Sequence, residues 1–228
     1  MGRPLAADRL KTWGRRGRGR QGMQKPVVVC LDLEGVLVPE IWINVALKTG
    51  IDELKMTTRE MPDYDQLMKQ RLGILDKHGL KISEIQAVIG EMGPLEGAVA
   101  FLGWLRERCQ VIILSDTFYQ FAQPLMRQLG YPTLFCNQLD IDLHGRIVNY
   151  HMRMQNPKKH AVASLKALNF FTMAAGDSYN DLGMLGEADK GFFFRPPDHL
   201  PKEFPTFPVT QTYGELQDCL VKVGCFPA

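Results

Sequence analysis

The sequence lacks a long apolar run, a pair of closely spaced cysteines and a cluster of histidines. No stretch approaches the roughly 18 consecutive apolar residues of a membrane helix, so we expect no membrane partner. None of the five cysteines forms a C-x-x-C pair, and the five histidines are scattered along the chain. These absences exclude a zinc site of the common spacing and favour buried, reduced thiols in the cytoplasm.

The sequence also lacks signals for nucleotide binding and for secretion. No predicted strand is followed by a G-x-x-x-x-G-K-S/T loop, which disfavours a nucleotide-dependent kinase. The amino-terminal residues contain no apolar segment of the kind found in secretory signals, so we expect no secretory signal. The 228 residues, of which 45% are hydrophobic, are enough for one α/β domain with a modest insertion.

Positive charge is concentrated in residues 1–22. They carry seven Arg or Lys and one acidic residue, a net charge of +6, whereas the remaining 206 residues carry 20 basic and 24 acidic side chains, a net charge of −4. Arg and Gly alternate over residues 14–22, which predicts a disordered basic arm, or an upstream extension if the protein starts at Met23. No aromatic residue except Trp13 lies among the arginines, so we expect no nucleic-acid partner.

Three apolar runs end in polar groups that are suited to chemistry. The runs are residues 27–31 before Asp32, 111–114 before Ser115, and 173–175 before Gly176-Asp177. Predicted helices lie between and beside them at residues 96–108, 118–129 and 157–168. This alternation predicts an α/β fold with a doubly wound, Rossmann-like parallel sheet, in which the three strand ends meet at one edge.

Residues 40–92 contain no convincing strand and predict a small helical cap inserted after the first strand. Asp63 is expected to cap one of its helices, and Ser83-x-x-Gln86 offers a capping box for the next. Such a cap would lie over the sheet edge, exclude water and select the substrate. The expected organisation is a core of residues 23–39 and 93–228 with a cap of residues 40–92.

The later part of the chain contains weaker structural signals. Residues 139–142 and 146–150 flank a His144-Gly145 turn, which is typical of a β-hairpin. Residues 192–194 predict a buried strand, residues 196–208 a surface connection, and residues 213–223 a terminal helix.

Asp32 and Glu34 place two carboxylates at the end of the first predicted strand. Residues i and i+2 of an extended segment point to the same side, so both groups flank one point in space. One carboxylate can be a nucleophile and the other an acid and base. Taken alone, such a pair is more often found at the start of a helix. The residues at the other strand ends are needed to distinguish a helix cap from a catalytic pair.

Four short motifs occur in order along the chain. They are Asp32-x-Glu34-Gly35-Val36, Ser115 at a strand end, a lysine in Pro157-Lys158-Lys159, and Gly176-Asp177-Ser178-Tyr179-Asn180-Asp181. Each is weak evidence alone. Together they resemble the haloacid dehalogenase superfamily of phosphohydrolases, and the resemblance covers residues 26–220.

Longer strings point to one subgroup of that superfamily. Asp-Leu-Glu-Gly-Val-Leu-Val-Pro-Glu, Asp63-Tyr64-Asp65 ahead of Met68-Lys69-Gln70-Arg71, and Ser115-Asp116-Thr117-Phe118 are similar to bifunctional phosphoserine phosphatase and phosphoserine:homoserine phosphotransferase proteins. The resemblance implies a Mg²⁺-dependent enzyme that hydrolyses O-phospho-L-serine through an aspartyl-phosphate and can also pass the phosphoryl group to homoserine.

The resemblance also implies catalytic and metal-binding roles. Asp32 is the expected nucleophile and Glu34 the expected acid and base. Asp32, the backbone carbonyl of Glu34 and Asp177 would hold Mg²⁺. Lys158 and Ser115 would hold phosphate oxygens, with Lys159 as a solvated neighbour.

Substrate-binding roles follow from the charges of phosphoserine. Glu40 is expected to bind its ammonium group and Arg71 its carboxylate, because an arginine fork can grip a carboxylate at two points. Asn180 is expected at the phosphate or seryl group, and Asp116 could offer its backbone N–H to phosphate. Asp181 would brace the motif lysine or the water shell of the metal.

The substrate and the class of protein leave alternatives open. Most phosphatases of the superfamily carry a second Asp where this chain has Glu34, and the longer side chain could hinder water activation or leave room for a second alcohol. A phosphatase of another small phosphomonoester is one alternative. A non-enzymatic receiver that accepts phosphate is another, although a receiver would lack the cap and the Gly176-Asp177 motif. Association into a homodimer also stays open.

Overall fold

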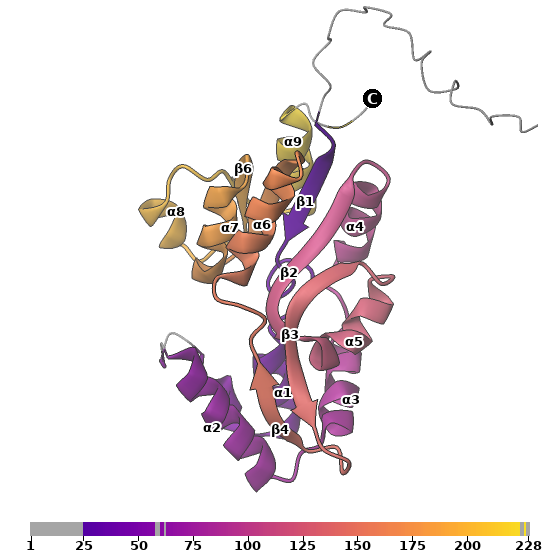
Figure 1. Cartoon of the computed structure of the whole chain (residues 1–228), viewed down its shortest axis with the longest axis vertical. Coiled ribbons are helices and arrows are strands. Elements are labelled where there is room, and N and C mark those ends of the chain that lie inside the picture. The colour runs from indigo at the N-terminus through magenta and orange to yellow at the C-terminus, as the bar shows by residue number, and fades with distance from the viewer. Residues whose placement is uncertain (1–24, 58–59, 62, 224–225, 227–228) are drawn as a thin grey trace, which may run out of the picture.

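The computed structural model describes residues 25–57, 60–61, 63–223 and 226 (Figure 1). The basic arm predicted for residues 1–22 therefore lies outside the described residues. In the part described, no helix is long and apolar enough to span a bilayer. The four cysteines that are described, Cys30, Cys109, Cys136 and Cys219, are free thiols.

A mostly parallel sheet forms the centre of the protein. In the described part it has seven strands in the order β4-β3-β2-β1-β5-β6-β7. The strands are β1 (Val27–Leu31), β2 (Gln110–Phe118), β3 (Thr133–Ile141), β4 (Ile147–His151), β5 (Phe171–Gly176), β6 (Lys190–Phe194) and β7 (Val209–Thr210). Neighbouring strands are parallel except β3 and β4, which form the predicted hairpin. This topology confirms the predicted doubly wound α/β fold.

Strand β1 is central because its residues are apolar and mostly β-branched, so that both of its faces can be covered. Val29 and Leu31 belong to one buried cluster, together with Phe101 of α4 (Ala98–Arg106). Cys30 points to the opposite cluster, together with Val162 of α6 (Pro157–Ala167). The side chains therefore alternate between two helical layers, as the period of a strand requires.

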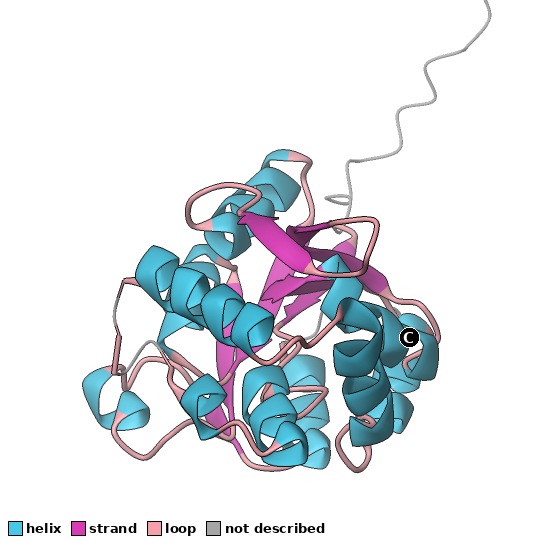
Figure 2. Cartoon of the chain, turned by 90° about the horizontal axis from the view of Figure 1, so that it is seen from below, coloured by secondary structure: helices cyan, strands magenta, loops and turns pink. Residues whose placement is uncertain are grey.

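Helices cover both faces of this sheet (Figures 1 and 2). Figure 1 shows α6 and α7 (Leu182–Glu187) on one side of the strands, and α4 and α5 (Tyr119–Gln128) on the other. Viewed from below in Figure 2, helices surround the strands. The terminal helix α9 (Tyr213–Lys222) packs on the α4 side, because its Leu216 lies in the same buried cluster as Phe101.

The segment between β1 and β2 is helical in the part described. It contains α1 (Ile41–Thr49), the 3-10 helix η1 (Asp52–Lys55), α2 (Tyr64–Lys77) and α3 (Ile82–Met92). The side chain of Asp63 accepts the N–H groups of Asp65 and Gln66, which confirms the predicted cap of α2. Figure 1 shows α2 beside β4, below the main part of the sheet.

The predicted capping box of the next helix is wrong. Helix α3 begins at Ile82, and the carboxylate of Glu84 accepts the backbone N–H of Lys81 at 2.8 Å. The N–H of Ile82 donates to the carbonyl of Gly145 in the β3–β4 turn at 2.9 Å. This long-range bond allows the helix to begin before Ser83, and it could not be predicted from local sequence.

Two other boundaries differ from those predicted. Strand β2 continues through Ser115 to Phe118 instead of ending at Leu114. Its pairing register with β3 shifts between Leu114 and Phe118. The connection predicted for residues 196–208 contains a short helix, α8 (Leu200–Glu203), whose Leu200 is fully buried.

Candidate active site

The carboxyl ends of three neighbouring strands meet at one point of the sheet. Leu31 of β1 pairs with Ile113 of β2 on one side and with Ala175 of β5 on the other. Asp32 follows directly, and its N–H donates to the carbonyl of Ala175 at 3.0 Å. The residues after these strands therefore lie around one site, as expected for ligand-binding edges of open α/β sheets.

Lys158 is the cation at the centre of this site. Its Nζ lies 2.9 Å from Oδ1 of Asp32, 2.8 Å from Oδ1 of Asp181 and 3.7 Å from Oδ2 of Asp116. Lys158 follows Pro157 in the first turn of α6 and is 3% exposed, whereas Lys159 faces solvent. Burial alone would lower the pKa of Lys158, but Asp181 and Asp32 raise it well above its ordinary value. The lysine therefore stays protonated.

Three carboxylates crowd one point beside this lysine. Single oxygens of Asp32, Asp177 and Asp181 all lie within 4.8 Å of one another. Burial, followed by repulsion from Asp181, raises the pKa of Asp32 well above its ordinary range and that of Asp177 to about 7. One lysine does not balance three negative groups, so the arrangement suits an additional cation with a preference for oxygen ligands.

Two glycines make this crowding sterically feasible. A Cβ atom at Gly35, where φ is +75°, would lie 2.5 Å from Cγ of Asp177. A Cβ atom at Gly176 would lie 2.3 Å from Cγ of Asp181. Larger residues at either position would displace the carboxylates, which explains why both motifs contain glycine at these points.

The carboxylate of Asp181 is already occupied by partners from the protein. Its Oδ1 accepts from Lys158, and its Oδ2 accepts the backbone N–H groups of Asp177 at 2.9 Å and Ser178 at 3.1 Å. Asp181 is fully buried. It therefore fixes both the lysine and the loop that carries Asp177.

Glu34 joins the strand end to the first helix of the insertion. Its Oε1 accepts the backbone N–H of Ile41 at 2.7 Å, in the first turn of α1. Burial, followed by repulsion from Glu40, raises the pKa of Glu34 to about 7. A carboxyl group held in this way has a fixed orientation and exchanges its proton near neutral pH.

Arg71 lies on α2 and is 6% exposed. One of its terminal nitrogens donates to the carbonyl of Met56 at 2.8 Å, while its buried Nε has no hydrogen-bond partner in the part of the chain that is described. Burial lowers the pKa of Arg71 to about 10, against the opposing influence of Tyr64, Glu34 and Glu40. The two acids therefore lie near a guanidinium group that still has donors to offer.

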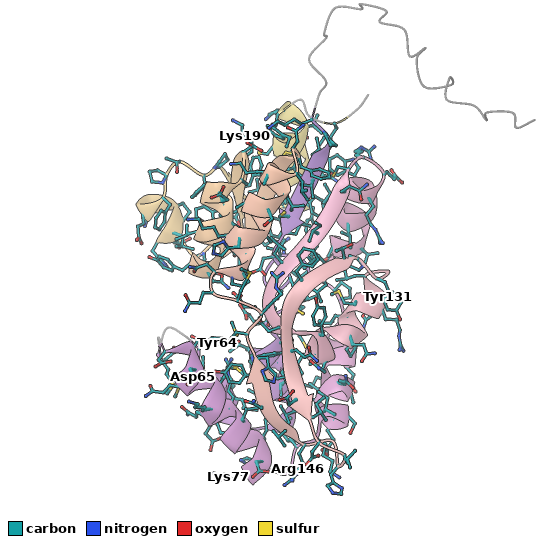
Figure 3. All side chains as sticks on the ribbon, in the orientation of Figure 1. Tyr64, Asp65, Lys77, Tyr131, Arg146 and Lys190 are labelled. Atoms are coloured by element: carbon teal, nitrogen blue, oxygen red, sulfur yellow. The ribbon has the colours of Figure 1, made fainter. Side chains whose placement is uncertain are left out.

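Asp116 connects the core to the segment that contains α2. Its Oδ2 accepts from Nδ2 of Asn180 at 2.8 Å, and its backbone carbonyl accepts from Nδ2 of Asn137 at 2.9 Å and the hydroxyl of Tyr64 at 3.4 Å. Figure 3 shows Tyr64 at the end of α2 nearest the core. The neighbouring Ser115 is 3% exposed, and its Oγ accepts the N–H of Thr117 at 3.1 Å.

The structure thus arranges the predicted residues in two groups. The first surrounds Lys158 and contains Asp32, Asp116, Asp177, Asn180 and Asp181, with Ser115 beside Asp116. The second consists of Glu34, Glu40 and Arg71, whose charges act on one another.

Sequence reasoning missed two polar residues of the site. Tyr64 stands inside one of the strings that resemble the subgroup, so its position could have been noticed. Asn137 is 2% exposed on β3 and belongs to no motif. Its contact with Asp116 depends on how β3 pairs with the end of β2 after the shift in register.

Comparisons with known proteins identify the family of this chain. The family model for haloacid dehalogenase-like hydrolases matches residues 27–189. A phosphoserine phosphatase from Pseudomonas syringae pv. tomato is 60% identical over 197 residues, covering 86% of this chain and 83% of the relative. Phosphoserine phosphatase ThrH from Pseudomonas aeruginosa is also 60% identical over 197 residues, covering 86% of this chain and 96% of the relative.

Solved structures are similar in fold. The phospho-aspartyl intermediate analogue of a phosphoserine phosphatase has a TM-score of 0.70 at 20% identity, covering 85% of this chain and 98% of that one. A substrate-bound phosphoserine phosphatase complex has a TM-score of 0.68 at 20% identity, covering 82% and 94%.

Proposed function

The chain belongs to the haloacid dehalogenase-like hydrolases, and from this premise we propose that it hydrolyses O-phospho-L-serine to L-serine and phosphate. The observation that carries the proposal is the buried contact of Lys158 with Asp32 and Asp181 at the end of the central strand. A carboxylate held there, with a cation to bind phosphate oxygens, is equipped to accept a phosphoryl group.

The crowded carboxylates support Mg²⁺ as the cofactor. Asp32, Asp177 and the backbone carbonyl of Glu34 would hold the ion, because hard oxygen ligands suit it. When bound, it would offset the repulsion between these carboxylates and the phosphate dianion. Asp181 is a poorer ligand, since protein donors already occupy both of its oxygens.

In the first step, Asp32 acts as the nucleophile. One of its carboxylate oxygens attacks phosphorus, the bond from phosphorus to the seryl oxygen breaks, and that oxygen leaves with the electron pair. Glu34 donates a proton to the leaving oxygen. Lys158 and Ser115 hold the other phosphoryl oxygens, where negative charge is spread in the transition state.

In the second step, Glu34 acts as the base. It takes a proton from a water molecule, whose oxygen attacks phosphorus, and the carboxylate of Asp32 leaves with its electron pair. The hydrogen bond from the N–H of Ile41 supports this double role, because it fixes the carboxyl group at the junction between the core and α1. Inorganic phosphate is released and the free carboxylate of Asp32 is restored.

Substrate recognition is assigned to the second group of charges. Arg71 would bind the substrate carboxylate through its fork of donors, and Glu40 would bind the ammonium group. Asn180 and Asp116 are joined by a hydrogen bond beside Lys158, which supports a place for them at the phosphate. The buried Nε of Arg71, which has no partner among the described groups, supports a ligand on that side chain.

Transfer of the phosphoryl group to homoserine is a second activity that we propose for the same intermediate. Glu34 supports this proposal, because its side chain is one methylene longer than the Asp found in most phosphatases of the superfamily and could leave room for a second alcohol. Homoserine carries the same ammonium and carboxylate groups as serine, so Glu40 and Arg71 would bind it as well. Its hydroxyl would then replace water in the second step.

Phosphate release with a panel of phosphomonoesters and Mg²⁺ tests the proposed function. We expect O-phospho-L-serine to be the preferred substrate, and Asp32→Asn to lose phosphate release. Equal activity of the variant would overturn the assignment of the nucleophile. Preference for an ester without an amino-acid moiety would favour the alternative phosphatase and overturn the roles of Glu40 and Arg71. Homoserine added to the assay should yield O-phosphohomoserine.

A further inference from the structure

Arg71 has an aromatic neighbour that none of the roles above includes. Its Cζ lies 4.4 Å from the ring centroid of Trp42, which is the second residue of α1. The guanidinium group also contacts the carbonyl of Met56 at 2.8 Å and the sulfur of Met68 at 3.9 Å. Only the first of these is a strong hydrogen bond, so the aromatic ring contributes substantially to the placement of the group.

The contact with Trp42 gives Arg71 no strong hydrogen-bond acceptor, because Cζ of Arg71 lies over the face of an aromatic ring. A carboxylate is a stronger acceptor than a ring face, so the contact with Trp42 leaves donors for a ligand. The buried Nε has no hydrogen-bond partner among the described residues, which is consistent with a ligand that binds this edge of the guanidinium group.

Trp42 also contacts a residue of the core. Its ring meets the edge of Phe121, a fully buried residue of α5, at a centroid distance of 5.3 Å and an interplanar angle of 75°. The preceding residue, Ile41, donates its N–H to Glu34 at 2.7 Å. The indole thus contacts both Phe121 of the core and Arg71, and it lies on the turn of α1 that is hydrogen-bonded to Glu34.

We propose that Trp42 is a positioning residue that sets the orientation of Arg71 relative to Asp32 and Glu34, and thereby the preference for substrates that carry a carboxylate. This inference rests on the proposed function, because it assigns the carboxylate to Arg71. Without the ring, the side chain of Arg71 would keep its charge and its bond to Met56 but could turn about that single bond.

The test compares two substrates on three proteins. O-Phospho-L-serine has a carboxylate, and O-phosphoethanolamine has the same phosphate and ammonium groups without it. Trp42→Leu removes the aromatic face, while Trp42→Phe keeps a smaller one and serves as the matched control. For Trp42→Leu we expect KM for phosphoserine to rise about tenfold with kcat changed less than about twofold. For phosphoethanolamine, kcat/KM should stay within about twofold of wild type, and Trp42→Phe should lie between the two proteins.

Two outcomes separate this role from a merely structural one. An equal loss of kcat/KM with both substrates would show that Trp42 only supports the packing against Phe121, and it would overturn the inference. In an Arg71→Met background, Trp42→Leu should have no further effect on phosphoserine, because the residue it positions is gone. Additive losses in the double variant would also overturn it.

Failure of the proposed function gives a different result. If wild-type protein does not discriminate between the two substrates, both the carboxylate assignment and the inference are wrong. If wild type discriminates and Trp42→Leu discriminates equally well, the assignment holds and the inference alone is wrong. Circular dichroism and melting temperature of each variant show whether it is folded, and a folded Trp42→Phe keeps the test decisive should Trp42→Leu not fold.

Discussion

The ammonium group of Lys158 lies 2.9 Å from the carboxylate of Asp32, and both side chains are at least 94% buried. Such a pair is costly to form and more costly to break, because removal of one partner leaves the other charged and unpaired. The pair lies at a strand end where three carboxylates meet, an arrangement that is typical of functional sites and that agrees with the catalytic roles proposed above.

Replacement of Lys158 should damage both activity and stability. Lys158→Met leaves Asp32 and Asp181 without their cation, so we expect a loss of about 10²-fold or more in kcat and a destabilisation of about 3 kcal/mol. Phosphate-release kinetics and urea unfolding measure the two effects. Lys159→Met is the matched control, and because this neighbour is exposed it should behave like wild type. Similar losses in both variants would contradict the assignment.

Binding of Mg²⁺ should stabilise the folded protein. The ion would relieve repulsion among Asp32, Asp177 and Asp181, and a ligand that binds only the folded state raises the melting temperature as its concentration exceeds Kd. Differential scanning fluorimetry of chelator-treated protein, titrated with Mg²⁺, measures this shift. Asp177→Asn should reduce the shift strongly. A full shift in that variant would remove Asp177 from the ligand set.

Glu34→Gln should separate the structural role of this side chain from its chemical one. The amide oxygen can still accept the N–H of Ile41, so the melting temperature should change little. The amide cannot donate or take the catalytic proton, so kcat should fall about 10²- to 10⁴-fold. Glu34→Asp keeps the carboxyl group but shortens it, and we expect a lower ratio of homoserine transfer to hydrolysis. An unchanged ratio would show that the extra methylene does not select the acceptor.

Buried cysteines should resist alkylation in the native protein. Burial raises the pKa of Cys30 from 9.0 to about 12, so almost none of it is thiolate at pH 8. The stabilisation from keeping this thiol neutral is fully present below pH 9 and is lost as pH rises toward 12. Iodoacetamide labelling followed by peptide mass spectrometry should find Cys30 unmodified until urea is added. Rapid labelling without urea would contradict its buried position.

Much of the fold could be predicted from local sequence. The run of Val and Leu before Asp32 has the composition of a strand covered on both faces, and Asp63 is a strong helix cap. The start of α3 could not be predicted, because it depends on the carbonyl of Gly145, which is distant in sequence. The extension of β2 past Leu114 depends on pairing with β3, which local composition does not encode.

Part of the candidate site could also be predicted from local sequence, whereas the rest depends on contacts between distant segments. Asp32, Ser115 and Asp177 could be predicted to lie together, because parallel strands bring their carboxyl ends to one edge. Asn137 and Trp42 make contacts between elements that are far apart in sequence, and no quoted motif includes either residue. The first contact depends on the pairing of β3 with β2 and the second on the position of Arg71, so local sequence could not predict them.

Detection of a phosphoryl group on Asp32 would show that this residue is the nucleophile. Wild-type protein, mixed rapidly with excess O-phospho-L-serine and Mg²⁺ and quenched in acid before the first turnover is complete, would be digested and examined by mass spectrometry. We expect the added mass of one phosphoryl group on the peptide that contains Asp32, and none in the Asp32→Asn variant. Serine release without any phosphorylated peptide, or phosphorylation at another residue, would contradict this role of Asp32.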